Sequence, residues 1–285
     1  MILGVDHLAL SCEDIDQGVQ LLAGLGYSPK FIQKDIPNPG AKRPLLRAYS
    51  ALHSLAYCQC GEHVALELTQ HSGPLRPMLS PYQVLLQGPP GDVPPWPGDL
   101  PSAWEIAWRL GLNCLQPQAR QWPPLQAQFW FDAGRDHPAP GLVRALLVPV
   151  QDLSRSGKFW TRGLGCRMLK RGEMEQGKGW LQLAFQAPVP AWRLEVILVE
   201  SEAARPPAFL DDPGFPCLAL ISSSLARDQD TAGEMGARES SEEFFLEVGE
   251  KVLKILMLRG PDQELLELIE IPKTGARRTG GTTHN

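Results

Sequence analysis

The chain has 285 residues, of which 43% are hydrophobic and 21% are charged, so it is long enough for about two domains with a substantial buried core. Its formal net charge of −5 gives no general electrostatic reason to bind a phosphate backbone, which argues against nucleic acid as a partner. No apolar run reaches the length that spans a membrane, so we expect no membrane partner either.

Cysteine usage and the first residues indicate a cellular compartment. Six cysteines are spread through the chain without a C-x-x-C pair, a spacing that indicates neither a zinc knuckle nor a disulfide framework. The acidic residues Glu13, Asp14 and Asp16 follow where a signal peptide would still be apolar. We therefore expect reduced thiols and a cytoplasmic protein.

The first seventy residues predict a strand, a helix and three further strands. Residues 2–10 alternate as a strand does, and the acidic segment 13–16 starts a helix that ends at Gly26. Proline and glycine breakers then separate three extended segments. These segments are residues 31–34, 45–58 and 63–69.

The same βαβββ order returns from Leu142 and again after residue 216. Repetition of a whole unit is stronger evidence than any single element. In the last copy the polar stretch 228–236 stands in the helix position and is the weakest signal. The predicted strands of the two copies are residues 143–150, 167–170, 180–185 and 192–199, then 217–221, 244–248, 252–258 and 265–271, and the first of these copies has its helix at 152–165.

Residues 74–138 match the βαβββ unit only weakly and contain a proline-rich insertion. A strand at 82–86, a helix at 100–110 and a closing strand at 125–131 are predicted there. Residues 137–140 have the composition of a linker, and the glycine-rich and arginine-rich tail from residue 273 is predicted to be disordered.

Four segments together resemble the vicinal oxygen chelate superfamily, which includes glyoxalase I, bleomycin and fosfomycin resistance proteins and extradiol dioxygenases. In the last segment, Gly260 to Glu270, Gln263 stands where the family's turn usually has a glycine. The segments are Asp6-His7-Leu8-Ala9-Leu10 with Asp14-Ile15, then Val64 to Gln70, Asp152 to Gly165 and Gly260 to Glu270.

The resemblance implies an α+β fold in which tandem βαβββ modules form two glyoxalase-like domains with curled mixed sheets. The expected domains are residues 1–138, with a degenerate second module, and residues 141–272, followed by a disordered tail at 273–285. A homodimer is compatible with this organisation.

The resemblance also implies a divalent metal held by the first and fourth strands of paired modules. Carried over, His7 and Glu67 occupy these two positions in the first module, Gln83 the next and Glu267 the last. Imidazole and carboxylate ligands suit Zn, Fe, Mn or Ni. A protein without any metal cofactor is equally compatible with this incomplete set.

The second half departs from the family's ligand pattern. Ala145 stands where a histidine is expected, and either Cys217 or Leu218 holds the corresponding place in the last module, although Glu195 and Glu267 remain. This departure argues against an extradiol dioxygenase and weakens an assignment as glyoxalase I.

Two functions remain, both with a small molecule as the partner. The first is metal-dependent lyase, isomerase or dioxygenase-type chemistry on an oxygenated organic substrate, and the alternative is metal-free binding of a drug-like molecule, as in bleomycin-resistance proteins. Glu67 lies between Leu66 and Leu68, so strand alternation turns its side chain away from theirs. If it faces a closed cavity without a partner, burial raises its pKa and makes it a candidate catalytic base rather than a metal ligand. His71 is a weaker candidate for a substrate contact.

Overall fold

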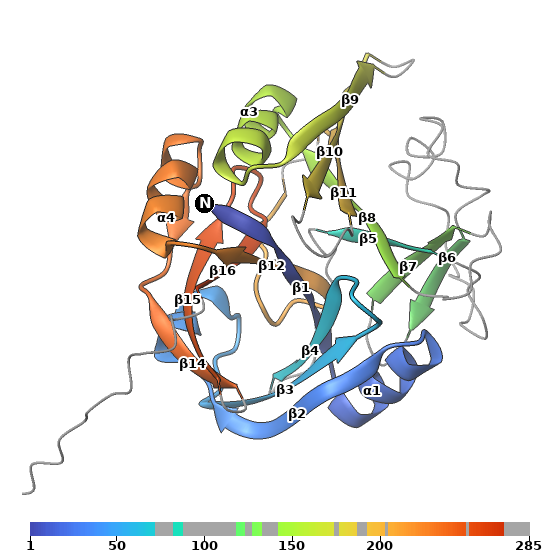
Figure 1. Ribbon diagram of the computed structural model, residues 1–285, viewed down its shortest axis with the longest axis vertical. Coiled ribbons are helices and arrows are strands. Elements are labelled where there is room, and N and C mark those ends of the chain that lie inside the picture. Colours follow the sequence, from blue (N-terminus) through green and yellow to red (C-terminus); the bar gives the residue numbers. More distant parts are fainter. Residues whose placement is uncertain are drawn as a thin grey trace, which may run out of the picture.

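The computed structural model describes residues 1–71, 82–87, 118–122, 127–132, 142–173, 177–186, 193–202, 205–248 and 251–270. These residues form two curled mixed sheets with helices packed against them, so the α+β fold class is confirmed (Figure 1). None of the helices in these ranges is long and apolar enough to cross a membrane.

The first module has the predicted βαβββ order. Asp14 caps its helix by accepting hydrogen bonds from the backbone nitrogens of Asp16 and Gln17. The expected strand at 45–58 begins only at Leu52, because residues 40–45 form a 3-10 helix that contains Pro44. The elements are β1 (Ile2–Cys12), α1 (Ile15–Gly24), β2 (Ser28–Pro37), η1 (Gly40–Leu45), β3 (Leu52–Gln59) and β4 (Ala65–His71).

The last module repeats this order and does contain a helix. The sequence indicates its helix α4 only weakly, because the buried residues along it are only Leu225, Asp228 and Ala232. One of these is itself polar, and the Asp228 carboxylate accepts a hydrogen bond from the Ser222 hydroxyl. The elements are β12 (Gly214–Ser222), α4 (Leu225–Glu234), β13 (Glu239–Ser240), β14 (Phe244–Val248), β15 (Lys251–Arg259) and β16 (Leu265–Glu270).

The two middle modules supply the second sheet. Strand β6 was not expected from the sequence, whereas the predicted helix at 100–110, the linker at 137–140 and the tail at 273–285 lie outside the described residues. The elements are β5 (Gln83–Gln87), β6 (Gln118–Trp122), β7 (Ala127–Asp132), β8 (Leu142–Val150), α3 (Leu153–Lys158), η3 (Phe159–Gly163), β9 (Arg167–Glu173), β10 (Gly179–Gln186) and β11 (Arg193–Glu200).

Strand pairing joins the first module to the last and the second to the third. The nine-stranded sheet has the order β13-β15-β16-β12-β1-β4-β3-β2, with β14 on β15, and the seven-stranded sheet has the order β6-β7-β5-β8-β11-β10-β9. The sheets are therefore not divided at residues 138–141, as the expected domains 1–138 and 141–272 would require. The antiparallel pairing of β1 with β12 satisfies an edge that each half-sheet would otherwise expose.

Alternate residues of the nine-stranded sheet pack into two separate cores. Leu8 and Leu10 of β1 belong to a core that also includes α1, α4 and the seven-stranded sheet. Ala9 faces the opposite way, into a second core on what we call the inner face. In Figure 1 the two ends of this sheet bend toward each other around that face. The inner face is covered by the segment with Leu45 and Leu46, by Ala208 and Leu210, and by β14.

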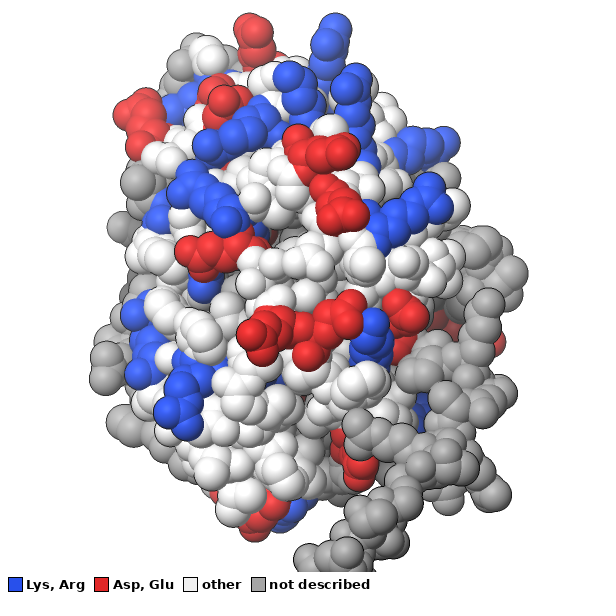
Figure 2. Space-filling model, turned by 90° about the vertical axis from the view of Figure 1, so that its left-hand side faces the viewer, with Lys and Arg blue, Asp and Glu red and all other residues white. Residues whose placement is uncertain are grey.

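Charges of both signs share the molecular surface. Figure 2 shows Lys and Arg side chains interspersed with Asp and Glu over the face that lies at the left of Figure 1. The charged residues that concern function lie instead on the inner face of the nine-stranded sheet.

Candidate functional site

Equivalent strands of the first and last modules bring four side chains into corresponding places. His7 and Cys217 hold the same place on β1 and β12, and Glu67 and Glu267 hold the same place on β4 and β16. The sequence left Cys217 and Leu218 open for the last module, and the strand register selects Cys217. The pairings that establish this are His7 with Ala65, Ala9 with Glu67, Cys217 with Leu265, and Ala219 with Glu267.

His7 lies between two carboxylates. Its Nδ1 is 2.8 Å from Oδ2 of Asp6, and its Nε2 is 3.6 Å from Oε1 of Glu67. The ring is only 3% exposed, its Nε2 has no hydrogen-bond partner among the described residues, and the ring of Tyr57 meets it edge-on at 5.8 Å. The strand alternation thus turns His7 and Glu67 toward each other on the inner face, as expected for Glu67 from its position between two leucines.

The carboxylates make His7 a cation. Burial alone lowers the pKa of His7, but Glu67, Asp6 and, more remotely, Glu267 together raise it to about 9. Burial raises the pKa of Glu67, while the charge of His7 opposes that rise. The charged forms of His7 and Glu67 therefore favour each other, and the Glu67 side chain in this pair is 17% exposed.

A lysine from a loop completes the charge distribution. Lys42 of η1 is 8% exposed, and its ammonium lies 5.7 Å from the centre of the Phe244 ring. Its positive charge acts on Glu67 and Cys217 in the direction that lowers their pKa values. Sequence reasoning missed Lys42 because it stands in an irregular segment without a strand or helix pattern.

The predicted metal ligands do not converge on one point. Gln83 lies on β5 opposite Leu147, in the other sheet, where it holds the place that corresponds to His7. Within the described ranges no three His, Cys, Asp or Glu side chains lie close enough to share an ion. Because Gln83 lies in the other sheet and no third such side chain of the described residues joins His7 and Glu67, the residues as arranged do not fit the metal site that the resemblance implies.

The seven-stranded sheet lacks this charge arrangement in its third module. Ala145 holds the place of His7, as expected, but Glu195 pairs with Ala145 and is therefore two residues away from the place of Glu67. Ile197 occupies that place instead. The carboxylate of Glu195 accepts a hydrogen bond of 2.7 Å from Nε2 of Gln182, which gives it a structural role.

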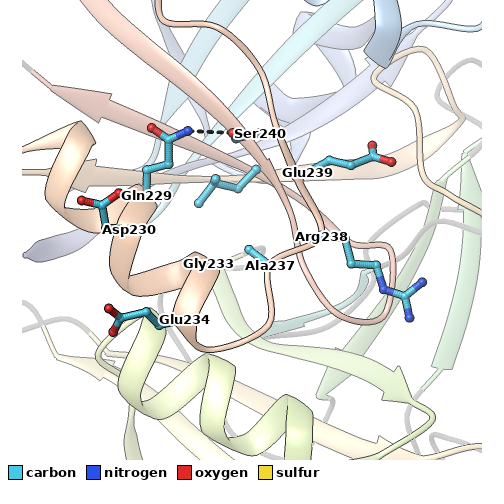
Figure 3. Close-up of a pocket in the computed structure, with 9 residues that line it drawn as sticks. Gln229, Asp230, Gly233, Glu234, Ala237, Arg238, Glu239 and Ser240 are labelled. Atoms are coloured by element: carbon cyan, nitrogen blue, oxygen red, sulfur yellow. Dashed lines mark hydrogen bonds between the residues drawn. The ribbon is translucent and has the colours of Figure 1, made fainter.

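Two hollows lie elsewhere on the molecule and contain none of the predicted site residues. The first, of about 550 Å³, lies between α4 and β13, where Gln229 donates a hydrogen bond to Ser240 and Arg238 and Glu239 carry opposite charges (Figure 3). The second, of about 920 Å³, lies beside the start of α3 and is lined by residues of β9 and β10, including Trp180. Both are open to solvent.

Comparison with known proteins identifies the fold. No protein-family model matches the sequence, and no curated protein matches it significantly in sequence. Among solved structures, glyoxalase I from Zea mays matches with a TM-score of 0.61 at 15% identity, covering 94% of this chain and 92% of that chain. A candidate dioxygenase from Bacillus subtilis matches with a TM-score of 0.54 at 10% identity, covering 95% of this chain and 86% of that chain.

These matches extend over both sheets, which a chance likeness of one module would not do. The chain therefore has a glyoxalase-like fold, in agreement with the expectation from the sequence.

Proposed function

We propose that the protein binds a small oxygenated organic molecule at the inner face of the nine-stranded sheet and moves a proton to or from it, in isomerase or lyase chemistry. The observation that carries this proposal is the ion pair between His7 and Glu67. Glu67 is the proposed catalytic base, and His7 is the group that keeps it ionised.

The electrostatics support this division of roles. An isolated buried carboxylate would take up a proton and lose its basicity. The imidazolium of His7, itself anchored by Asp6, favours the ionised form of Glu67 in spite of its burial. Glu67 can then take a proton from a carbon next to a carbonyl group and return it to the neighbouring atom, while His7 stabilises the negative charge that develops on the oxygen.

The second candidate is binding of a small molecule without turnover and without a metal. It is favoured by the aromatic side chains around the pair, since Tyr57 stacks on Phe31 with 5.5 Å between ring centres. Rings in this arrangement suit a flat or cationic ligand. The two candidates share the site and differ in whether Glu67 exchanges a proton with the ligand.

Exchange of carbon-bound protons in D₂O tests the proposal. The protein, treated with a chelator, is incubated with hydroxyaldehydes, hydroxyketones and oxo acids, and loss of the proton signal next to the carbonyl group is followed by NMR. We expect exchange with the wild type and a rate lower by about a hundredfold or more for Glu67→Gln. The matched control is Glu247→Gln, at an exposed position of β14, which should exchange as the wild type does.

Three other outcomes would replace the proposal. Exchange that occurs only after Zn, Mn, Ni or Fe is added would establish the metal-dependent reaction instead. Stoichiometric binding without exchange, insensitive to chelator, would select the binding protein. Equal exchange by wild type and Glu67→Gln would remove Glu67 from the reaction.

A further inference from the structure

Two histidines lie together on the inner face, away from His7. His53 of β3 and His71 of β4 are direct partners in the antiparallel pairing, and their rings are nearly parallel, with 6.1 Å between centres and an angle of 17°. They are 3% and 8% exposed. His71 follows Glu67 by four residues on the same strand, so both side chains project from the same face of β4, about 13 Å apart.

The four ring nitrogens of this pair are buried without a hydrogen bond of good geometry among the described residues, although the backbone of Ile36 lies near the His53 ring. Burial and the nearby charge of Lys42 lower the pKa of His53 to about 3 and that of His71 to about 4. Each ring is therefore neutral and offers one N–H donor and one acceptor. Buried polar groups are normally paired, so these two stacked imidazoles have unused capacity to donate and accept hydrogen bonds.

The charge beside the pair is positive. Lys42 is buried on η1 and has no carboxylate of the described ranges within ion-pair distance. The negative charge that acts on His71 is that of Asp211, whose carboxylate already accepts hydrogen bonds from the backbone nitrogens of Arg47 and Ala48. A metal cation would be repelled by Lys42, whereas an anion would be attracted.

We propose that His53, His71 and Lys42 form a subsite for the anionic group of a small organic acid, either a carboxylate or a phosphate. Two imidazole N–H groups and one ammonium would donate to its oxygens, which would give all three buried side chains a partner. The inference deepens the proposed function by naming the ligand class, and its link to catalysis rests on that function. The binding of an anion by this trio stands independently of whether Glu67 transfers a proton.

Anion titrations of the full-length protein test this subsite. Inorganic phosphate and acetate are added separately at constant ionic strength, and the imidazole ¹H–¹⁵N signals are followed by NMR. We expect saturable shifts of the His53 and His71 signals with at least one probe, and the probe that binds more tightly distinguishes a phosphate from a carboxylate ligand. Lys42→Met should weaken this binding by about tenfold or more.

Two further variants separate the subsite from general charge effects. Lys30→Met removes a positive charge from an exposed position of β2 and should bind both probes as the wild type does. Lys42→Arg keeps the positive charge and should retain anion binding. Its comparison with Lys42→Met shows whether binding depends on the charge at position 42. Absence of saturable shifts with both probes, or equal binding by Lys42→Met and Lys30→Met, would overturn the proposal. Neither outcome would affect proton exchange by Glu67, and Glu67→Gln should leave anion binding in place.

Discussion

At the scale of single residues, the inner face holds charged side chains, and further buried charges lie elsewhere in the fold. His7, Glu67 and Lys42 are held there by three different elements, β1, β4 and η1. Ionised groups inside a fold persist where opposite charges lie close to them. The pair of His7 and Glu67 meets this condition, whereas Lys42 has no carboxylate of the described residues within ion-pair distance.

Glu264 is a buried carboxylate away from the inner face, and its contribution to stability depends on pH. It accepts hydrogen bonds from the backbone nitrogen of Asp262 and from Nε1 of Trp160, where the β15–β16 turn packs against the η3 segment of the third module. Burial and the charge of Asp262 raise its pKa to about 7 from a usual 4.5. Between these two values the folded protein binds more protons than the unfolded chain, so the free energy of unfolding decreases as pH rises.

Replacing Glu264 with glutamine should remove this part of the pH dependence. We expect the free energy of unfolding of Glu264→Gln, relative to the wild type, to increase between pH 4.5 and 7 and then to remain constant. Urea denaturation at several pH values measures the difference in the free energy of unfolding between the two proteins. The amide group can shift this difference by a constant amount, but it does not change how the difference depends on pH. Parallel pH profiles for the two proteins would show that Glu264 titrates normally.

At the scale of elements, the β15–β16 turn holds a residue other than glycine, Gln263, in a left-handed backbone conformation. The superfamily's usual turn has a glycine where this chain has Gln263, and the backbone of Gln263 does adopt the left-handed conformation, with φ of 71°. Its carbonyl accepts hydrogen bonds from the backbone of Ala208 and from Arg259, so the conformation cannot relax without losing them. The substitution of glycine by glutamine therefore leaves local strain in the turn.

Substitutions at this position measure the strain. Gln263→Gly should raise the free energy of unfolding by up to about 1 kcal/mol, because glycine adopts a positive φ without a steric penalty. Gln263→Val should lower it by about 1–2 kcal/mol, since a β-branched side chain is disfavoured there. Urea denaturation at fixed pH compares the two variants, and equal stability would contradict the strained turn.

Regular elements could be predicted from the sequence where alternation and helix starts are strong. Asp14 and Asp152 marked the beginnings of α1 and α3, and both side chains accept hydrogen bonds from the first turn. The weak signal for α4 reflects its polar, mostly exposed surface, and residues 45–51 were mistaken for the start of a strand because Leu45 and Leu46 pack against the inner face. Local patterns cannot distinguish such packing from strand alternation.

At the scale of the whole molecule, pairing of the first and last modules adds Glu267 to a site whose other charged groups, His7, Glu67 and Lys42, come from the first module. His7 and Glu67 were predicted because each lies on a strand that matches a superfamily segment, and the strand register then placed them together. Gln83 was grouped with them wrongly because sequence order suggested that neighbouring modules pair. His53 and Lys42 were missed because their role depends on contacts between distant segments, which no local pattern records.

The central claim is that both modules contribute charge to one site around His7. The most direct measurement is an NMR titration of the His7 imidazole in the wild type, in Glu67→Gln and in Glu267→Gln. The account predicts a pKa of about 9 in the wild type, a large decrease in Glu67→Gln and a smaller decrease in Glu267→Gln, because carboxylates from both modules stabilise the cation. A wild-type value near 6.5 that neither substitution changes would contradict it.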